Sequence, residues 1–364
     1  MIYTLIVVAV IVVAVLLYLR QAQFGRIATG SDVERIQNSR NYKTNQFQNV
    51  SYTPQLTGGV SMFKVMREFF FNKDKRNVPS HELPSKKTDL FQLDPSENVL
   101  VWFGHSSYFI QLDGKKFLID PVLNGHASPI KFTTRSFKGS DVYQADDIPQ
   151  IDFLLITHDH YDHLDYETIL QLKQKTNKVI TGLGVAIHFE RWGYDKNIIT
   201  EMDWNEEVKI ENFIVNTTPA RHFSGRTFKR NTSLWLSFVL ASPGKKIFIG
   251  GDSGYDTHFK TIGEKFGSFD LAILESGQYN PYWKFIHMMP EETVQAAEDL
   301  QAKKLLPVHW AKFSLSLHAW DEPIKRVVAE AKTKGVDVVH PMIGEAVYLD
   351  KENSFTEWWN MVPA

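Results

Sequence analysis

A seven-residue segment of this chain, residues 157–163, concentrates side chains that bind metals. It reads Thr-His-Asp-His-Tyr-Asp-His and directly follows the apolar run Phe-Leu-Leu-Ile. Such a run predicts a buried strand that ends at the segment, and imidazole and carboxylate are the ligands of zinc and similar divalent cations. One cation seldom takes four ligands from one short loop, which favours two metals. His158 and His160 suit one cation, and Asp162 and His163 suit a second.

Three more residues of ligand type follow predicted strands elsewhere in the chain: His222, Asp252 and His309. A lone aspartate or histidine at a strand end is more often a cap or a satisfied polar residue. Four strand ends that each carry a ligand type are hard to explain without a shared metal site. Asp252 also follows Gly250-Gly251, where the backbone can come close, so its carboxylate can bridge two cations. In a two-metal hydrolase the water held between the ions is activated for attack.

The order of these segments resembles the metallo-β-lactamase superfamily, and within it N-acyl-phosphatidylethanolamine phospholipase D and its bacterial relatives. The metal motifs carry the resemblance to the superfamily, and other segments carry the resemblance to the phospholipase branch. The matching segments run from about residue 98 to 348: Trp102-Phe103-Gly104-His105-Ser106-Ser107, Ile119-Asp120-Pro121, Ala127-Ser128-Pro129, residues 158–165, Gly251-Asp252-Ser253-Gly254-Tyr255, residues 266–272, His287-Met288-Met289-Pro290-Glu291-Glu292 and His309-Trp310.

The resemblance implies a full set of seven ligands for two zinc ions per protomer. It places the first ion on His158, His160 and His222. It places the second ion on Asp162, His163 and His309. Asp252 would bridge the two, and Asp162 would also orient the attacking water.

Other residues are predicted to support this site. A ligating imidazole needs an acceptor for its second nitrogen, and Asp120 and Asp165 are the candidates, although either could instead cap a strand or a helix. His287 lies outside the ligand set, and the resemblance implies that it stabilises the oxyanion or protonates the leaving alcohol. His105, in a Gly-His-Ser-Ser turn, is expected to pack between loops, with a place in the lining of the site as the alternative.

The loop before His287 is aromatic and apolar. Its side chains predict a groove for acyl chains, and for any single residue core packing is the competing interpretation. The groove candidates are Tyr279, Trp283, Phe285 and Met288.

The pattern of apolar residues predicts a layered α/β domain. Runs at 108–112 and 116–119 flank Asp113-Gly114, which is a strong hairpin signal. Residues 290–303 read as a helix, with proline and two glutamates in the first turn. Strands that first form hairpins and then alternate with helices favour such layers, and the resemblance makes this the αββα sandwich.

The N-terminal residues 1–19 carry no charged side chain and are dominated by valine, isoleucine, leucine and alanine. They predict an uncleaved single-pass membrane anchor, with a cleaved signal peptide as the alternative. Basic residues follow the run and none precedes it, which predicts a catalytic domain on the cytoplasmic side. They are Arg20, Arg26, Arg35 and Arg40.

The remaining boundaries follow from composition. Residues 20–95 are a polar linker and N-terminal extension, 96–350 the catalytic domain, and 351–364 a C-terminal tail. Within the extension, residues 62–71 predict a short helix that packs on the core, with contact to a lipid surface as the alternative.

Composition excludes some classes of protein. The net charge of −2 gives no general basic field, which argues against a nucleic-acid enzyme, and the absence of cysteine excludes disulfides and thiolate metal sites. The sequence therefore predicts a membrane-anchored zinc phosphodiesterase that acts on an N-acyl-phosphatidylethanolamine or a related phospholipid. A lactonase or esterase of the same fold, or a phosphodiesterase on a soluble substrate, is the alternative. A homodimer is left open.

Overall fold

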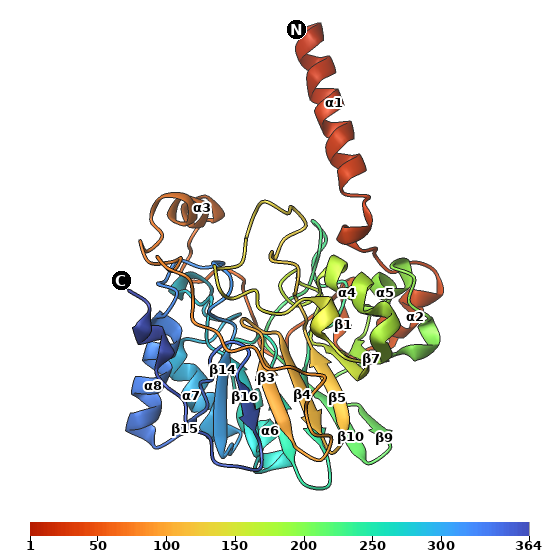
Figure 1. Ribbon diagram of the computed structural model, residues 1–364. Helices are drawn as coiled ribbons and strands as arrows, with labels where there is room; N and C mark the ends of the chain where they lie inside the picture. Colours follow the sequence, from red (N-terminus) through yellow and green to blue (C-terminus); the bar gives the residue numbers. More distant parts are fainter. Residues whose placement is uncertain (364) are drawn as a thin grey trace.

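The computed structural model describes residues 1–363, and two seven-stranded sheets dominate it (Figure 1). The first sheet has the order β16-β3-β4-β5-β6-β7-β8. In that order its strands are Ala346–Tyr348, Val99–Trp102, Tyr108–Leu112, Lys115–Ile119, Ile151–Ile156, Thr176–Gly182 and Ile199–Met202. Strands β5 to β8 are mutually parallel, so their carboxyl ends lie at one edge of the sheet.

The second sheet has the order β15-β14-β13-β12-β11-β10-β9. In that order its strands are Asp337–Val338, Lys304–Val308, Leu271–Glu275, Lys246–Ile249, Ser237–Ala241, Phe213–Thr218 and Glu207–Ile210. Strands β12 to β15 are parallel, and β10 shares their direction because it is antiparallel to β11, which is antiparallel to β12. The carboxyl ends of β10, β12 and β14 therefore lie at one edge.

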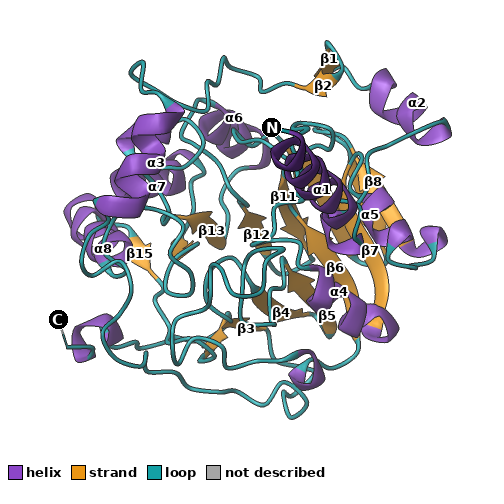
Figure 2. Ribbon diagram, turned by 90° about the horizontal axis from the view of Figure 1, so that it is seen from above, coloured by secondary structure: helices purple, strands orange, loops and turns teal. Residues whose placement is uncertain are grey.

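Apolar side chains alternate between two packed layers along the strands. In β13, Leu271 and Ile273 point into the layer between the sheets, whereas Ala272 and Leu274 point to the helices outside. Helices cover both outer faces, as the view from above shows (Figure 2). Helices α4 (Tyr166–Leu172) and α5 (Ala186–Arg191) pack on the first sheet, and α6, α7 and α8 pack on the second. The predicted αββα sandwich is confirmed.

The three helices on the second sheet and the predicted hairpin of the first sheet have the following positions. Helices α6, α7 and α8 are His258–Phe266, Pro290–Asp299 and Glu322–Lys334. The predicted hairpin is present, because Asp113 and Gly114 both have positive φ between β4 and β5, as a tight two-residue turn requires.

The predicted membrane anchor over residues 1–19 is wrong. Helix α1, Ile2–Tyr18, is apolar and projects away from the two sheets in Figure 1, but it has 17 residues. At 1.5 Å per residue it is about 26 Å long, short of the roughly 30 Å of a bilayer's hydrocarbon core. Within residues 1–363 no helix combines the length and apolarity that a bilayer crossing requires. The predicted cytoplasmic placement of the catalytic domain depended on this anchor, so that prediction is wrong as well.

The predicted short helix exists as α3, Met62–Phe71, but it does not pack on the core. None of its ten described residues is buried, and Phe63 and Phe71 are 79% and 80% exposed. One side of α3 instead faces a cavity at the sheet edge, through Met62, Val65 and Phe69.

Segments outside the two large sheets also add side chains to the core of the domain. The 2-residue strands β1 (Tyr42–Lys43) and β2 (Gln46–Phe47) form a hairpin after helix α2, Ser31–Asn38. Phe47 of this hairpin is fully buried. At the other end of the chain, Trp358 and Trp359 are buried against Trp310, so the C-terminal segment contributes to the core.

Candidate metal centre

Four strands deliver the predicted ligands to one place at the sheet edge. The loop after β6 carries residues 158–163, and β14 is followed directly by His309. His222 and Asp252 lie in the loops after β10 and β12. The two sheets thus contribute from opposite sides, and all seven residues meet in two contiguous groups.

The first group consists of His158, His160, His222 and Asp252, whose ligand atoms all lie within 4.8 Å of one another. The Nε2 atom of His158 is 2.9 Å from Nδ1 of His160, and Nε2 of His222 is 3.2 Å from the same atom. Asp252 Oδ2 lies 3.8 Å from His158 Nε2 and 3.6 Å from His222 Nε2. These are the residues expected to hold one cation.

The second group consists of Asp162, His163, His309 and a residue we did not predict as a ligand, His105. Asp162 Oδ2 is 3.7 Å from His163 Nε2 and 3.0 Å from His105 Nε2. His105 is fully buried and packs against His309, with 4.0 Å between ring centroids and 39° between the ring planes. The sequence offered one signal for it, since His105 also comes just after a strand, β3.

Asp252 stands between the two groups, as a bridging carboxylate should. Its Oδ2 atom is near the first group and also lies 3.2 Å from His163 Nε2. Its other oxygen, Oδ1, is 3.2 Å from Nδ1 of His309.

Polar groups behind the imidazoles fix their orientation. Nδ1 of His163 donates to Asp120 Oδ2 at 2.8 Å, which is the contact expected of Asp120. Nδ1 of His222 donates to the carbonyl of Ile286 at 2.8 Å. Holding the second nitrogen in this way leaves the first one aimed at the site.

Gly251 allows the two main loops to approach each other. It has φ +60°, and a Cβ atom there would stand 2.9 Å from the Cβ of Thr157, directly before His158. Asp120 and His309 also adopt positive φ, at 42° and 70°. Non-glycine residues in this conformation are uncommon and cluster at functional sites, where the surrounding structure must hold them.

Electrostatics in the centre reflect burial and neighbouring charge. Burial lowers the pKa of His158 and His222 well below the ordinary range, with further lowering from adjacent imidazoles. Burial acts the same way on His163, but the carboxylates of Asp252 and Asp162 outweigh it and raise its pKa. Burial raises the pKa of Asp252. Burial therefore favours the neutral, metal-binding form of His158 and His222, whereas the neighbouring carboxylates favour the protonated form of His163.

The donor set fits divalent cations. Nε2 of His163 and Oδ1 of Asp252 are buried and lack a well-formed hydrogen bond among residues 1–363. Buried polar groups are normally satisfied, so convergent orphan nitrogen and oxygen atoms indicate a missing partner. Imidazole and carboxylate together are the ligand chemistry of zinc.

His287 lies beside the ligands without belonging to the predicted set. Its ring is 5.0 Å from that of His222 and 5.2 Å from that of His309, between centroids. Its Nδ1 is 3.3 Å from Oε1 of Glu275, the last residue of β13. Glu275, which the sequence analysis missed, is fully buried, and burial raises its pKa well above the ordinary value.

Two predictions about surrounding residues are wrong. Asp165 does not reach a ligating imidazole; it caps α4 by accepting from the backbone N–H of Thr168 at 2.8 Å. Three of the four groove candidates point elsewhere. Met288 is buried in the layer under α7, Phe285 lies under the guanidinium of Arg221, and Tyr279 donates to Glu322. Only Trp283 of that group lines the cavity, because neighbouring side chains of an irregular loop point in different directions.

The cavity above the ligands has a volume of about 390 Å³. His160, Asp162, His222, Asp252, His287 and His309 line its floor. Its walls are largely apolar and come from α3, from the loop around Trp283 and from single residues elsewhere. The apolar lining residues are Leu56, Met62, Val65, Phe69, Phe223, Trp283, Ile286 and Leu315.

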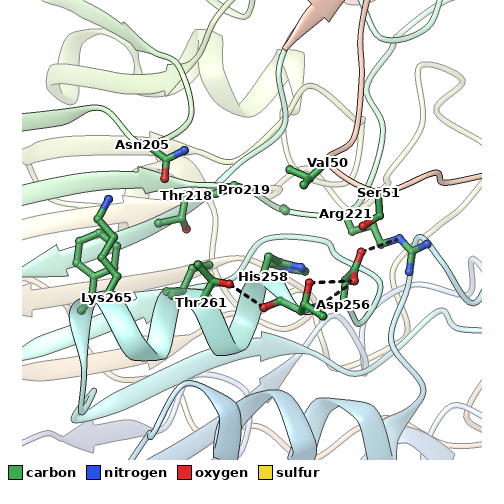
Figure 3. A pocket seen from close by; sticks show the side chains of 14 residues that line it. Val50, Ser51, Asn205, Thr218, Pro219, Arg221, Asp256, His258, Thr261 and Lys265 are labelled. Atoms are coloured by element: carbon green, nitrogen blue, oxygen red, sulfur yellow. Dashed lines mark hydrogen bonds and ion pairs between the residues drawn. The ribbon is translucent and has the colours of Figure 1, made fainter. Parts of the chain in front are cut away.

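A second cavity, of about 220 Å³, lies between α6 and the segment that leads to His222 (Figure 3). Thr218, Arg221, Asp256 and Lys265 are among its lining residues. Arg221 is already paired with Asp256 at 3.6 Å. None of the seven predicted ligands lines this cavity, so it is separate from the metal centre.

Comparisons with known proteins agree with this architecture. A profile of the family described as "Beta-lactamase superfamily domain" matches residues 115–310. An uncharacterized protein of Mycobacterium tuberculosis is 34% identical over 342 residues, which are 92% of each chain. The N-acyl-phosphatidylethanolamine-hydrolyzing phospholipase D 1 of Caenorhabditis elegans is 31% identical over 267 residues, covering 65% of this chain and 74% of the relative.

Solved structures share the fold. Igni18, a metallo hydrolase from the archaeon Ignicoccus hospitalis, matches with a TM-score of 0.55 at 20% sequence identity. The match covers 70% of this chain and 99% of that chain. At this identity the likeness shows the fold alone.

Proposed function

The chain belongs to the metallo-β-lactamase superfamily and is a metal-dependent hydrolase of that fold, and from this premise we propose that it cleaves a phosphodiester. The proposed substrate is an N-acyl-phosphatidylethanolamine or a related phospholipid. The products are phosphatidic acid and an N-acylethanolamine. The proposed cofactor is a pair of zinc ions on the seven residues of the centre.

One observation carries this proposal: five of the seven predicted ligands line the floor of a cavity whose other walls are largely apolar. A phosphodiester anion suits a site built for two cations, and hydrocarbon chains suit walls such as Val65, Phe69 and Leu315. The activity named for the Caenorhabditis elegans relative supports the same substrate class.

Two divalent cations, when bound, activate water and neutralise charge on the phosphoryl group. Two side chains of the protein are proposed to supply the other functions, which are to orient the water and to contact the leaving group or the phosphoryl oxygen. Asp162 is 14% exposed at the cavity floor, and it is held ionised against the effect of burial by His163 and by its hydrogen bond with His105. It is placed to orient the attacking water.

His287 supplies the second polar function. It lines the cavity beside Asp252 and His309, and Glu275 contacts its Nδ1 from behind. Burial lowers its pKa, and the nearby carboxylates of Asp252 and Asp162 oppose that effect. Its Nε2 is then free to face the leaving alcohol or the charged phosphoryl oxygen.

A lipid panel with and without chelator tests the proposal. Purified protein reconstituted with zinc is incubated with N-acyl-phosphatidylethanolamine, phosphatidylcholine and a long-chain lactone in mixed micelles. We expect phosphatidic acid and N-acylethanolamine from the first lipid, and loss of both products after chelation. Lactone hydrolysis without cleavage of any phosphodiester would instead support the lactonase alternative.

A further inference from the structure

Arg230 lies at the rim of the metal-site cavity. It lines the same cavity as His160, Asp162 and Asp252. It is the only lysine or arginine among the described residues that line this cavity. Its side chain is exposed, so its guanidinium is accessible from solvent.

The loop that carries Arg230 is closed by its own backbone. The N–H of Asn231 donates to the carbonyl of Ser224 at 2.9 Å, and the N–H of Phe47 donates to the carbonyl of Asn231 at 2.8 Å. Gly225 lets the loop close tightly, because a Cβ there would stand 3.2 Å from the Cα of Arg230. The loop is therefore held in place at the residue next to Arg230.

The guanidinium is also placed relative to the metal ligands. It lies over the ring of Phe223, with 5.1 Å from its Cζ to the ring centroid. The same ring packs on His160 at 4.5 Å and on His222 at 4.7 Å, between centroids. One aromatic ring therefore separates the positive charge from two predicted ligands.

Arg230 has no acidic partner within 4.0 Å among residues 1–363. Its contacts are neutral: it donates to Oε1 of Gln55 and stacks on Phe223. The nearby Arg221 differs, since it pairs with Asp256 and lies outside this cavity. A guanidinium held by neutral groups keeps its charge and several of its N–H donors for an incoming anion.

We propose that Arg230 is a specificity-determining residue that binds an anionic phosphate oxygen of the substrate. This inference rests on the proposed phosphodiesterase function. A two-cation centre can attack both anionic diesters and neutral esters. Arg230 would make the site prefer the anionic diesters. A forked donor suits phosphate, because two parallel N–H groups can meet two oxygens.

Three variants and two substrates test this role. Arg230→Gln removes the charge, Arg230→Lys keeps it without the fork, and Lys229→Gln removes the adjacent exposed charge that does not line the cavity. Each zinc-loaded protein is assayed on bis(4-nitrophenyl) phosphate, an anion, and on 4-nitrophenyl acetate, which is neutral. We expect Arg230→Gln to raise KM for the anion roughly tenfold, as for a lost charge-assisted hydrogen bond, and to leave KM for the neutral ester unchanged.

The matched variants distinguish a specific contact of Arg230 from a general effect of surface charge. Arg230→Lys should recover part of the loss, and Lys229→Gln should behave as wild type on both substrates. Equal losses in Arg230→Gln and Lys229→Gln would overturn the inference in favour of a general surface field. Equal effects of Arg230→Gln on the anionic and the neutral ester would also overturn it.

A binding measurement separates this inference from the proposed function. Calorimetry with diphenylphosphinate, a tetrahedral anion without a scissile ester, should show roughly tenfold weaker binding to Arg230→Gln, and benzoate should show a smaller change. If wild type binds the phosphinate through Arg230 but cleaves no diester, the proposed function fails, and the part of the inference that stands is that Arg230 binds a tetrahedral anion at this cavity. If wild type cleaves the diester and Arg230→Gln binds phosphinate normally, the inference fails and the proposed function stands.

Discussion

The floor of the metal-site cavity carries buried imidazoles, whereas its roof, helix α3, has no buried residue among the ten described. At the floor, His222 is oriented by its hydrogen bond to the carbonyl of Ile286, and His163, just below the floor, by its hydrogen bond to Asp120. On the roof, Phe63 and Phe71 are mostly exposed, and α3 reaches the cavity through only part of its surface. The floor is thus fixed by the fold, while the roof can change without disturbing the sheets.

Gly251→Ala should have the largest effect. The new Cβ would meet Thr157 at 2.9 Å in a positive-φ conformation, so the loops that carry His158 and Asp252 must separate. We expect a loss of roughly 2–4 kcal/mol in the free energy of unfolding together with loss of zinc binding. Denaturant melts and metal analysis measure both.

The matched control is Gly244→Ala, where a Cβ meets nothing within 4 Å and φ is not positive. It should melt as wild type does. If Gly251→Ala behaved like Gly244→Ala, the close approach of the two loops would not be needed.

His287→Ala should lower kcat on a phospholipid by roughly a hundredfold without loss of metal, because the ring lines the cavity beside the ligands but is not a predicted ligand. On a substrate with a nitrophenol leaving group, the defect shrinks if His287 protonates the leaving alcohol and persists if it stabilises the oxyanion. The control is His258→Ala, in the separate cavity of Figure 3, which should leave kcat unchanged. Unchanged kinetics in His287→Ala on both substrates would reduce the residue to a packing role.

Asp120→Asn should weaken zinc binding by about 10- to 100-fold, since the amide cannot accept the hydrogen bond of His163 as the carboxylate does. Competition with a chelating dye gives the zinc affinity. Asp165→Asn is the control, because Asp165 caps α4 and touches no ligand. Equal zinc affinities in the two variants would mean that Asp120 does not orient His163.

Phe69→Ala, on the roof, should have the smallest effect. The ring lines the cavity but is only partly buried, so the melting temperature should stay within about 1–2 °C of wild type. Turnover of a small diester should hardly change, whereas turnover of a long-chain phospholipid should fall several-fold. Phe63→Ala, which points away from the cavity, should alter neither rate. A large loss of stability in Phe69→Ala would contradict the independence of the roof.

The same contrast explains what the sequence could predict. Strand ends that point to one edge must bring their following residues together, so residues 158–163, His222, Asp252 and His309 could be placed by pattern alone. Asp120 followed from the same rule. His105 obeys it as well, after β3, and was missed because a lone histidine in a turn is usually a packing residue.

The roof follows no such rule. An exposed helix and an irregular loop have no period that says which side chain faces a cavity, so Met288 and Phe285 were misassigned and Val65 and Phe69 were overlooked. The predicted membrane anchor at the N-terminal segment, residues 1–19, was wrong for a different reason, which concerns the length of that segment's helix. Its apolar character was read correctly, but the helix itself is 17 residues long.

Metal stoichiometry tests the central claim most directly. Protein stripped by chelation, reconstituted with zinc and desalted should carry two zinc ions per chain by elemental analysis. Asp252→Asn should carry fewer than two and lose about 4 kcal/mol of transition-state stabilisation, roughly a thousandfold in kcat/KM. One zinc ion or none in the wild-type chain, or full stoichiometry and activity in Asp252→Asn, would contradict a centre built on seven converging ligands with Asp252 as the bridge.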